Sequence, residues 1–317
     1  MTHTRINIGL SALLSGFLLC ASCSEEVSVG ESFGESVPLG VSSLHLDGEL
    51  ATRSGGTPVT TDDATIAVFL TNTGGYTPMY NKTYTYSGGN WSSTDPVCVD
   101  KRTGKALAVY DPNGLVSFGT NSTVTTNTLQ AQAYDEKKLW YYDNTNGTGI
   151  NSTNAVLAFS MKPAYSRLSF SISRHANYPL ACKVSQIVIK PSSGNFYTNA
   201  RVNIADGSLT GTAVASYAIN TSALPVNSTG IAIGTPDTSI DQLFPAQSLA
   251  AGAGLTFTLT TDGKDHSVTV PAATFNKIQA GVHYTVQLEI TGVGIVVGSV
   301  TTADWAASNS NIDSKFD

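Results

Sequence analysis

The chain has 317 residues, a formal net charge of −6 and only 13% charged residues. Soluble domains usually carry about 25% charged residues, so we expect a polar but weakly charged surface. The Lys and Arg residues are scattered and form no basic patch, which excludes nucleic acid as an expected partner. A chain of this length suggests two domains once a leader is removed.

The first 23 residues have the pattern of a lipoprotein signal peptide. Arg5 precedes an apolar run from Ile6 to Leu19, and two small residues stand just before Cys23. The run is shorter than the ~20 apolar residues that a membrane-spanning helix needs. We therefore expect export, cleavage before Cys23 and acylation of that cysteine, which would tether the protein to the outer membrane through lipid. An ordinary signal peptide, cleaved without lipidation, is the alternative.

Residues 24–53 are expected to form a propeptide. They hold six of the 23 acidic residues and a single Lys or Arg, so the acidity belongs to this leader. Apolar residues alternate within it and change phase once, at Ser42-Ser43. The alternating residues are Val37, Leu39, Val41, Leu44 and Leu46. The pattern predicts a strand with one buried face, and the change of phase indicates a bulge or a crossing between sheets.

Arg53 follows this strand and precedes Ser54 and two glycines. Small, flexible residues after an arginine allow a trypsin-like protease to thread the chain into its active site. Cleavage between Arg53 and Ser54 would remove the lipid anchor and the strand together, leaving an apolar groove with unpaired backbone groups. Such a groove favours capture of an extended segment from another subunit. An arginine that merely lies exposed beside glycines is the alternative.

The rest of the chain has an all-β pattern, because short alternating apolar runs are separated by turn residues and no long stretch has a helical period. The predicted strands are Thr65–Thr71, Tyr80–Tyr86, Lys105–Tyr110, Ala155–Met161, Leu168–Ile172, Val184–Ile189, Leu255–Leu259, Ser267–Val270 and Val282–Ile290. Asp262-Gly263 is expected to form a tight hairpin turn. Asn127 to Lys138 is the best candidate for a short helix.

Two tandem β-sandwich domains are the economical architecture for these strands. Pro163 is a plausible junction, which gives an N-terminal domain of residues 54–162 and a C-terminal domain of residues 163–317.

Near the C-terminus a nearly continuous apolar run precedes an aromatic residue. The run includes Ile295, Val297 and Val300, and the aromatic residue is Trp305. The run predicts either a buried central strand or a donor segment, taken as residues 295–316, that the groove of another subunit accepts.

No catalytic or metal-binding pattern is present in the sequence, so we expect neither an enzyme nor a cofactor. The histidines after the signal peptide lack the spacing of metal ligands; they are His45, His175, His266 and His283. Cys98 and Cys182 fall in different predicted domains and are expected to stay unpaired.

Two further segments have alternative interpretations. Asp143 to Gly147 superficially resembles a calcium loop but lacks the distant bidentate acid, which favours a plain Asn-Gly turn. Aromatic residues cluster in two stretches, Tyr84 to Trp91 and Trp140 to Tyr142. They are predicted either as core and cross-strand pairs or as a stacking platform for sugars.

Several stretches together carry a resemblance to a known family. They are Ala51-Thr52-Arg53, Asp62 to Phe69 with Tyr84 and Trp91, Ala155 to Phe170, and the tail from Phe275 to Trp305. The tail is the most specific, with Ala280-Gly281-Val282-His283-Tyr284-Thr285-Val286 and a final Thr301-Thr302-Ala303-Asp304-Trp305. Over essentially its whole length the chain resembles the fimbrillin family of type V pilus subunits.

The resemblance implies two transthyretin-like β-sandwich domains with Greek-key-type connections. It also implies transport to the cell surface as a lipoprotein, cleavage at Arg53 by an arginine-specific protease, and donor-strand exchange with other pilin subunits in a fimbrium used for adhesion to host or bacterial surfaces. Only 12 residues follow Trp305, which leaves stalk, tip and accessory roles open. A surface lipoprotein that binds glycans through a β-sandwich and never polymerises is the alternative function.

Overall fold

The structure is a computed structural model that describes residues 33–47, 57–118, 126–221 and 230–304. Its regular elements are almost all β-strands, and the two helical elements among the described residues are 3-10 turns of three residues, η1 (Thr73–Gly75) and η2 (Glu136–Lys138). The all-β fold class is thus confirmed, as is each strand predicted in the body of the chain.

The N-terminal strands form one large sheet and one small one. The large sheet has the order β3 (Thr57–Pro58), β2 (Gly40–Leu46), β13 (Val156–Pro163), β11 (Tyr141–Asp143), β8 (Gly104–Tyr110), β4 (Thr65–Leu70), β5 (Met79–Ser87) and β6 (Asn90–Ser92), and β12 (Thr148–Ile150) also pairs with β8. The small sheet pairs β1 (Val37–Pro38) with β7 (Cys98–Val99). Within the large sheet only β2 and β13 run parallel.

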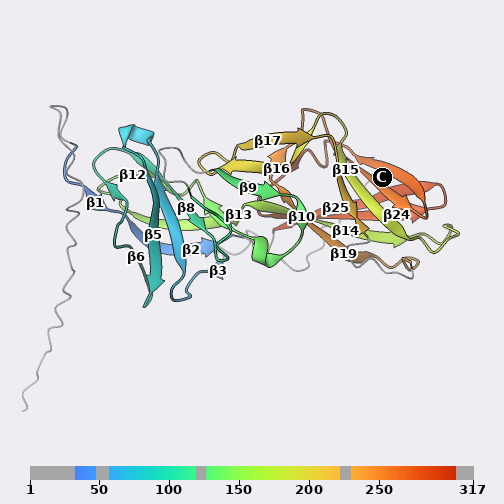
Figure 1. The fold of residues 1–317 in the computed structure, drawn as a ribbon, viewed down its shortest axis with the longest axis horizontal. Coiled ribbons are helices and arrows are strands. Elements are labelled where there is room, and N and C mark those ends of the chain that lie inside the picture. The colour runs from blue at the N-terminus through green and yellow to red at the C-terminus, as the bar shows by residue number, and fades with distance from the viewer. Residues whose placement is uncertain (1–32, 48–56, 119–125, 222–229, 305–317) are drawn as a thin grey trace, which may run out of the picture.

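The C-terminal strands form four further sheets. The five-stranded sheet has the order β10 (Gln132–Ala133), β19 (Asp237–Pro245), β14 (Tyr165–Arg174), β24 (Val282–Thr291) and β25 (Gly294–Asp304). A four-stranded sheet has the order β18 (Tyr217–Asn220), β15 (Val184–Pro191), β21 (Leu255–Thr261) and β22 (Lys264–Val270). The others join β17 (Leu209–Val214), β16 (Phe196–Asn203) and β9 (Thr126–Gln130), and β20 (Gln247–Ser248) with β23 (Lys277–Ile278). In Figure 1, β1, β5 and β6 lie toward one end of the long axis, and β15 and β24 lie toward the other.

The five- and four-stranded sheets pack face to face because both alternate apolar residues along their strands. Phe170 of β14 is fully buried and meets Phe257 of β21 edge to face, with ring centroids 5.5 Å apart. Ile187 and Leu259 lie in the same core. The period of two places every second side chain between the sheets, which is the β-sandwich arrangement.

The hairpin between β21 and β22 turns where the sequence predicts. Asp262 and Gly263 both have positive φ, at 49° and 80°, as a type I′ turn requires.

The predicted helix from Asn127 to Lys138 is wrong. This segment forms β9 and β10 before the short η2, which Asp135 caps by accepting a hydrogen bond from the Lys137 amide (2.9 Å). β9 pairs with β16, and β10 pairs with β19. Distant strands therefore supply the backbone partners that a local helix would otherwise provide, and both strands lie among the C-terminal sheets in Figure 1.

The aromatic stretches are mainly core, as one of the two interpretations predicts. Tyr84, Trp91 and Trp140 are at most 8% exposed. Tyr86 and Trp91 face each other across β5 and β6, with ring centroids 5.3 Å apart. These buried rings offer no open platform for a sugar.

Asp143 organises the loop that superficially resembles a calcium site. Asp143 is 2% exposed, and its carboxylate accepts hydrogen bonds from the amides of Thr145 (2.8 Å), Asn146 (3.1 Å) and Ser160 (2.9 Å). The side chains of Thr145 and Asn146 donate as well. Both oxygens are thus engaged by the protein itself, which fits a plain turn.

We expect Asp143→Ala to lower the free energy of unfolding by roughly 1–3 kcal/mol, because three backbone amides in part-buried hydrogen bonds lose their charged acceptor. Denaturant titration measures the change. Asp95→Ala is the control, since the Asp95 side chain is 71% exposed and its ion pair with Lys82 lies at the surface. Equal effects of the two substitutions would contradict this role for Asp143.

Candidate functional site

Residues 33–47, called the leader segment below, are held by the body of the protein on both sides. β1 pairs with β7, whereas β2 pairs with β13 and β3. The Leu39 amide donates to the carbonyl of Val97 (2.7 Å), and the Gly40 amide donates to that of Ala155 (2.7 Å). The leader segment therefore passes from the small sheet to the large one within three residues.

The predicted change of phase is confirmed as a register shift in β2. Val41 lies opposite Leu157, whereas Ser43 lies opposite Ala158, so Ser42 is the extra residue. Its hydroxyl donates to the carbonyl of Leu157 (3.0 Å). A bulge of this kind keeps apolar residues facing inward on both of its sides.

The apolar residues of the leader segment complete the N-terminal core. Leu39 and Leu44 are 2% and 1% exposed, Val41 is also buried, and Val37 and Leu46 pack partly buried against the same cluster. Full burial of one such side chain stabilises a fold by about 1.5–3 kcal/mol. Departure of the strand would open an apolar groove unless another strand takes its place.

Tyr84 connects the leader segment to the body. Its hydroxyl donates to the carbonyl of Leu39 (3.0 Å) and accepts from the amide of Val97 (3.1 Å). The ring is 2% exposed, so this contact forms inside the core, where the crossing between the two sheets occurs.

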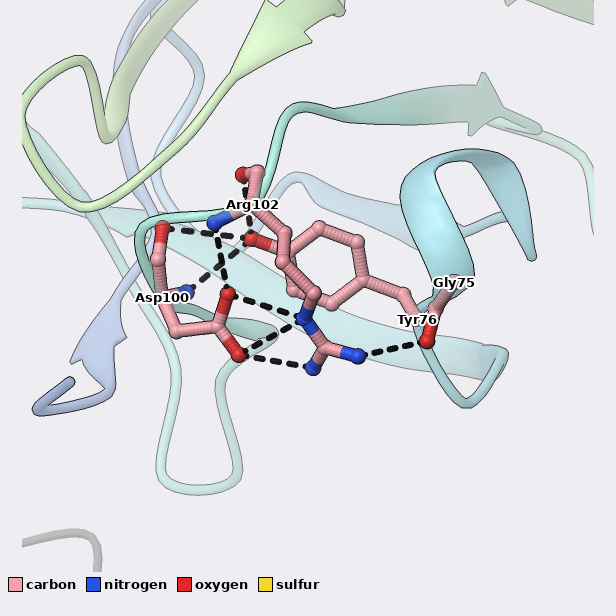
Figure 2. A network of polar contacts seen from close by, with 4 residues as sticks. All are labelled: Gly75, Tyr76, Asp100 and Arg102. Atoms are coloured by element: carbon pink, nitrogen blue, oxygen red, sulfur yellow. Dashed lines mark hydrogen bonds and ion pairs between the residues drawn. The ribbon is translucent and has the colours of Figure 1, made fainter. Parts of the chain in front are cut away.

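A second set of contacts lies beside the N-terminal end of the leader segment and centres on Arg102 (Figure 2). Its Nε and Nη2 bind both carboxylate oxygens of Asp100 at 2.6–3.1 Å, and its Nη1 donates to the carbonyl of Gly75 (2.5 Å). The guanidinium carbon lies 4.4 Å from the centroid of the Tyr76 ring and 4.3 Å from that of the Phe33 ring. We call Tyr76, Asp100 and Arg102 the arginine platform.

Glycine at position 74 is required for this geometry. Gly74 has a φ of 71°, and a Cβ there would lie 1.9 Å from the carbonyl oxygen of Thr103. The close approach brings η1 against the chain that follows Arg102, which places the Gly75 carbonyl on the guanidinium. Gly104 leaves room for the Tyr76 ring, because a Cβ would lie 2.8 Å from it.

Contacts within the arginine platform stabilise the charged forms of Asp100 and Arg102. Burial acts to raise the pKa of the Asp100 carboxyl, but hydrogen bonds from the side chain and backbone of Arg102 outweigh burial and lower it. The bond to Asp100 in turn raises the pKa of Arg102. Tyr76 donates to the Arg102 carbonyl (2.7 Å) and accepts from the Asp100 amide (3.0 Å), and its own pKa is raised, chiefly by burial.

The described part of the candidate donor segment, residues 295–304, lies in β25 (Gly294–Asp304), at the edge of its sheet. The predicted buried central strand is therefore wrong in position: β25 pairs with β24 at one side of the five-stranded sheet. Ile295 and Val300 are each 7% exposed and Val297 is partly buried, whereas Val296 is 46% exposed. Ile295 and Val300 therefore pack into the core of the C-terminal sandwich.

Four of the predicted site residues lie outside the described residues. They are Cys23, Arg53, Ser54 and Trp305. Within the described part of the chain, no helix is long and apolar enough to cross a membrane.

A polar cluster on β14, β19 and β24 contains a serine, a histidine and an aspartate. Ser169 Oγ contacts Asp241 and lies 2.5 Å from His283 Nε2, while Arg167 binds Asp241 (2.6 Å). The serine lies between the other two groups, whereas a nucleophilic triad needs the histidine in the middle. Burial, with the nearby Arg167, lowers the pKa of His283 to about 4, so the imidazole is neutral at physiological pH.

Cys98 and Cys182 are both buried, and no disulfide joins them, as expected from the sequence. Burial raises the pKa of Cys182 to about 11, so this thiol is a poor nucleophile. In the described ranges, three or more His, Cys, Asp or Glu side chains nowhere gather closely enough to hold a metal ion.

The sequence does not single out the arginine platform. Phe33, Tyr76 and Arg102 are far apart in the chain and belong to no common motif. The available signal is Gly74-Gly75 directly before Tyr76, since paired glycines indicate a tight loop with positive φ. Nothing in this pattern indicates what the loop contacts.

We expect Leu44→Ala to reduce the free energy of unfolding of the uncleaved chain by about 2–5 kcal/mol, because it leaves a cavity in the core. Glu35→Ala is the matched control, since Glu35 belongs to the same segment and is exposed. Chemical denaturation of both variants provides the comparison. A change of less than 1 kcal/mol for Leu44→Ala would show that the leader segment contributes little to the core.

Acid should weaken the arginine platform. The pKa of Asp100 is lower in the folded than in the unfolded chain, so its stabilising effect is complete above about pH 4 and is lost as the pH falls further. Between pH 6 and pH 2 the free energy of unfolding should therefore fall less steeply for Asp100→Asn than for the unsubstituted chain. Asp95→Asn, at an exposed site, should leave the slope unchanged; identical slopes for all three proteins would contradict the prediction.

Three solved structures share this fold at low sequence identity. A candidate adhesin from Bacteroides ovatus is 12% identical, with a TM-score of 0.52 over 86% of this chain and 96% of the other. A fimbrial protein from Bacteroides vulgatus is 13% identical, with a TM-score of 0.50 over 85% and 99%. A candidate cell adhesion protein from Bacteroides uniformis is 14% identical, with a TM-score of 0.50 over 83% and 98%. Such identities show likeness of fold alone.

The sequence itself gives the decisive comparison. No curated protein sequence matches the chain, but the pattern of a family described as fimbrillin-like matches residues 52–305. This match covers most of the chain and confirms the resemblance noted from the sequence: the chain belongs to the fimbrillin-like family.

Proposed function

We propose that this protein is a structural subunit of a pilus, exported as a lipoprotein acylated at Cys23, activated by cleavage after Arg53 and polymerised by donor-strand exchange. The observation that carries the proposal is the leader segment: it completes the N-terminal core with Leu39 and Leu44, yet it precedes a potential cleavage site. Removal of such a strand creates a groove that another strand can fill.

The extent of the family match supports this division of the chain. The match begins at Thr52, next to Arg53, and leaves the leader segment outside. The proposed precursor thus consists of a signal peptide of residues 1–23, a propeptide of residues 24–53, and two sandwich domains of residues 54–162 and 163–317. The lipid serves as a temporary anchor in the outer membrane, because cleavage after Arg53 removes it with the propeptide.

The partners of the protein are other pilin subunits, and β25 is the proposed donor. An edge strand has backbone partners on one side only, so it can exchange more readily than a central strand. Ile295 is buried and Val297 is partly buried, with the exposed Val296 between them, which resembles the alternation of Leu39 and Val41 that they would replace. Trp305 follows directly in the sequence.

Adhesion to host or bacterial surfaces is the proposed role of the assembled fimbrium. The fold is shared with a fimbrial protein from Bacteroides vulgatus and with candidate adhesins. The alternative, a lipoprotein that binds glycans and never polymerises, receives no support from Trp91 and Trp140, which are buried in the cores.

Treatment of the purified precursor with an arginine-specific protease should yield a ladder of oligomers on an unheated gel, with Ser54 as the new N-terminus. Arg53→Ala should remain monomeric under the same treatment, because its propeptide stays attached. Arg201→Ala is the control, since this exposed arginine lies in β16, away from the leader. A wild-type chain that is cut after Arg53 and remains monomeric would refute polymerisation, and a cellular protein that still begins at Cys23 would refute processing.

A further inference from the structure

The leader segment makes one contact that lies beyond its strands. Phe33 is four residues ahead of Val37, where β1 begins, and its ring rests on the guanidinium of Arg102 at 4.3 Å. Its carbonyl accepts a hydrogen bond from the Lys101 amide (3.2 Å). Phe33 is 42% exposed, so this aromatic contact closes the end of the groove rather than its interior.

All the groups that orient Arg102 belong to the body of the protein. Asp100 binds the guanidinium through two oxygens, and the Gly75 carbonyl accepts from Nη1. The Tyr76 ring covers the guanidinium at 4.4 Å, and Figure 2 shows the polar contacts among Gly75, Tyr76, Asp100 and Arg102. Loss of the leader therefore leaves these contacts of the guanidinium in place, whereas it removes the pairing of β1 with β7 and the bond from the Lys101 amide to Phe33.

We propose that the arginine platform is a binding subsite for an aromatic side chain, an inference that rests on the proposed exchange of strands. The subsite recognises an aromatic residue just beyond the end of the strand that occupies the groove. The partner is an extended segment of another subunit that carries an aromatic ring outside its alternating apolar residues. Phe33 occupies the subsite before processing and shows the chemistry that it accepts.

The physical reason is register. A strand that slips by one residue turns its apolar side chains to the wrong face, and the backbone bonds of β7 and β13 alone accept any register. A ring stacked on a guanidinium at a fixed distance from the first buried residue adds an attraction that only one register satisfies. Lys101 reinforces the alignment, because its amide binds the carbonyl of the same residue that presents the ring.

The weakly charged surface of the protein makes this recognition distinctive. A cation beside an acidic group would ordinarily attract charged partners, but Asp100 already neutralises Arg102. What is left for a ligand is the flat, delocalised face of the guanidinium that the Phe33 ring contacts at 4.3 Å. Such a face favours an aromatic ring over a carboxylate or an aliphatic side chain.

The test uses the protease-treated chain after the leader has been separated from it in mild denaturant and the protein refolded. Fluorescent peptides of residues 33–47 are titrated against it by anisotropy, in three forms: unchanged, Phe33→Ala and Phe33→cyclohexylalanine. The last keeps the apolar size of the ring but lacks its π face. We expect the unchanged peptide to bind roughly 2- to 10-fold more tightly than either variant, as a cation–π contact of about 0.5–1.4 kcal/mol requires.

Two variants of the protein, tested against the same three peptides, complete a double-mutant cycle. In Arg102→Gln the three peptides should bind equally, whereas the control Arg201→Gln should keep the preference for Phe33. Because the preference is a ratio within each protein, a general loss of affinity does not obscure it. Should Arg102→Gln fail to fold, the comparison of phenylalanine with cyclohexylalanine on the unsubstituted protein still decides the question.

The outcomes separate the two proposals. Equal binding of all three peptides to the unsubstituted protein, or a preference that survives in Arg102→Gln, overturns the aromatic subsite while leaving strand exchange intact. Failure of every peptide to bind overturns strand exchange itself, and the subsite with it.

Discussion

Burial of Leu39 and Leu44 beneath the N-terminal sheets is the interaction on which the proposed life cycle of this protein depends. These side chains come from the leader segment, which the proposed cleavage would remove, yet they lie among the most deeply buried residues. The folded precursor therefore requires the segment for its core. A subunit without it has an unfilled apolar groove, and association with another chain is the natural way to fill it.

The crossing of the leader segment between two sheets makes that groove specific. β1 pairs with β7 and β2 pairs with β13, and the bulge at Ser42 adjusts the phase between Val41 and Leu44. Tyr84 bridges the crossing point by bonding to Leu39 and Val97. A strand that replaces the leader must satisfy both sheets at once, so a flat, regular strand would leave part of the groove unfilled.

Much of this architecture can be predicted from alternation and turn residues, since these are local. The buried face of the leader, its change of phase at Ser42 and the Asp262-Gly263 turn all follow from spacing within about ten residues. The segment from Asn127 to Lys138 could not be predicted in this way, because its strands are specified by partners far along the chain, at Asn199 and Leu243 among others. The arginine platform could not be predicted for the same reason, because Phe33 and Arg102 are distant in sequence and lie together beside the pairing of β1 with β7.

The edge position of β25 has a consequence for the size of any assembly. The groove and the proposed donor strand belong to different sheets and lie at different places on the subunit, so the surface that gives a strand is not the surface that receives one. If subunits exchange strands, head-to-tail contacts of this kind build an open filament wherever the rotation between neighbours does not close a ring. Nothing within one subunit then specifies a final length, and growth has to be stopped by a chain whose groove stays filled or whose donor strand is missing.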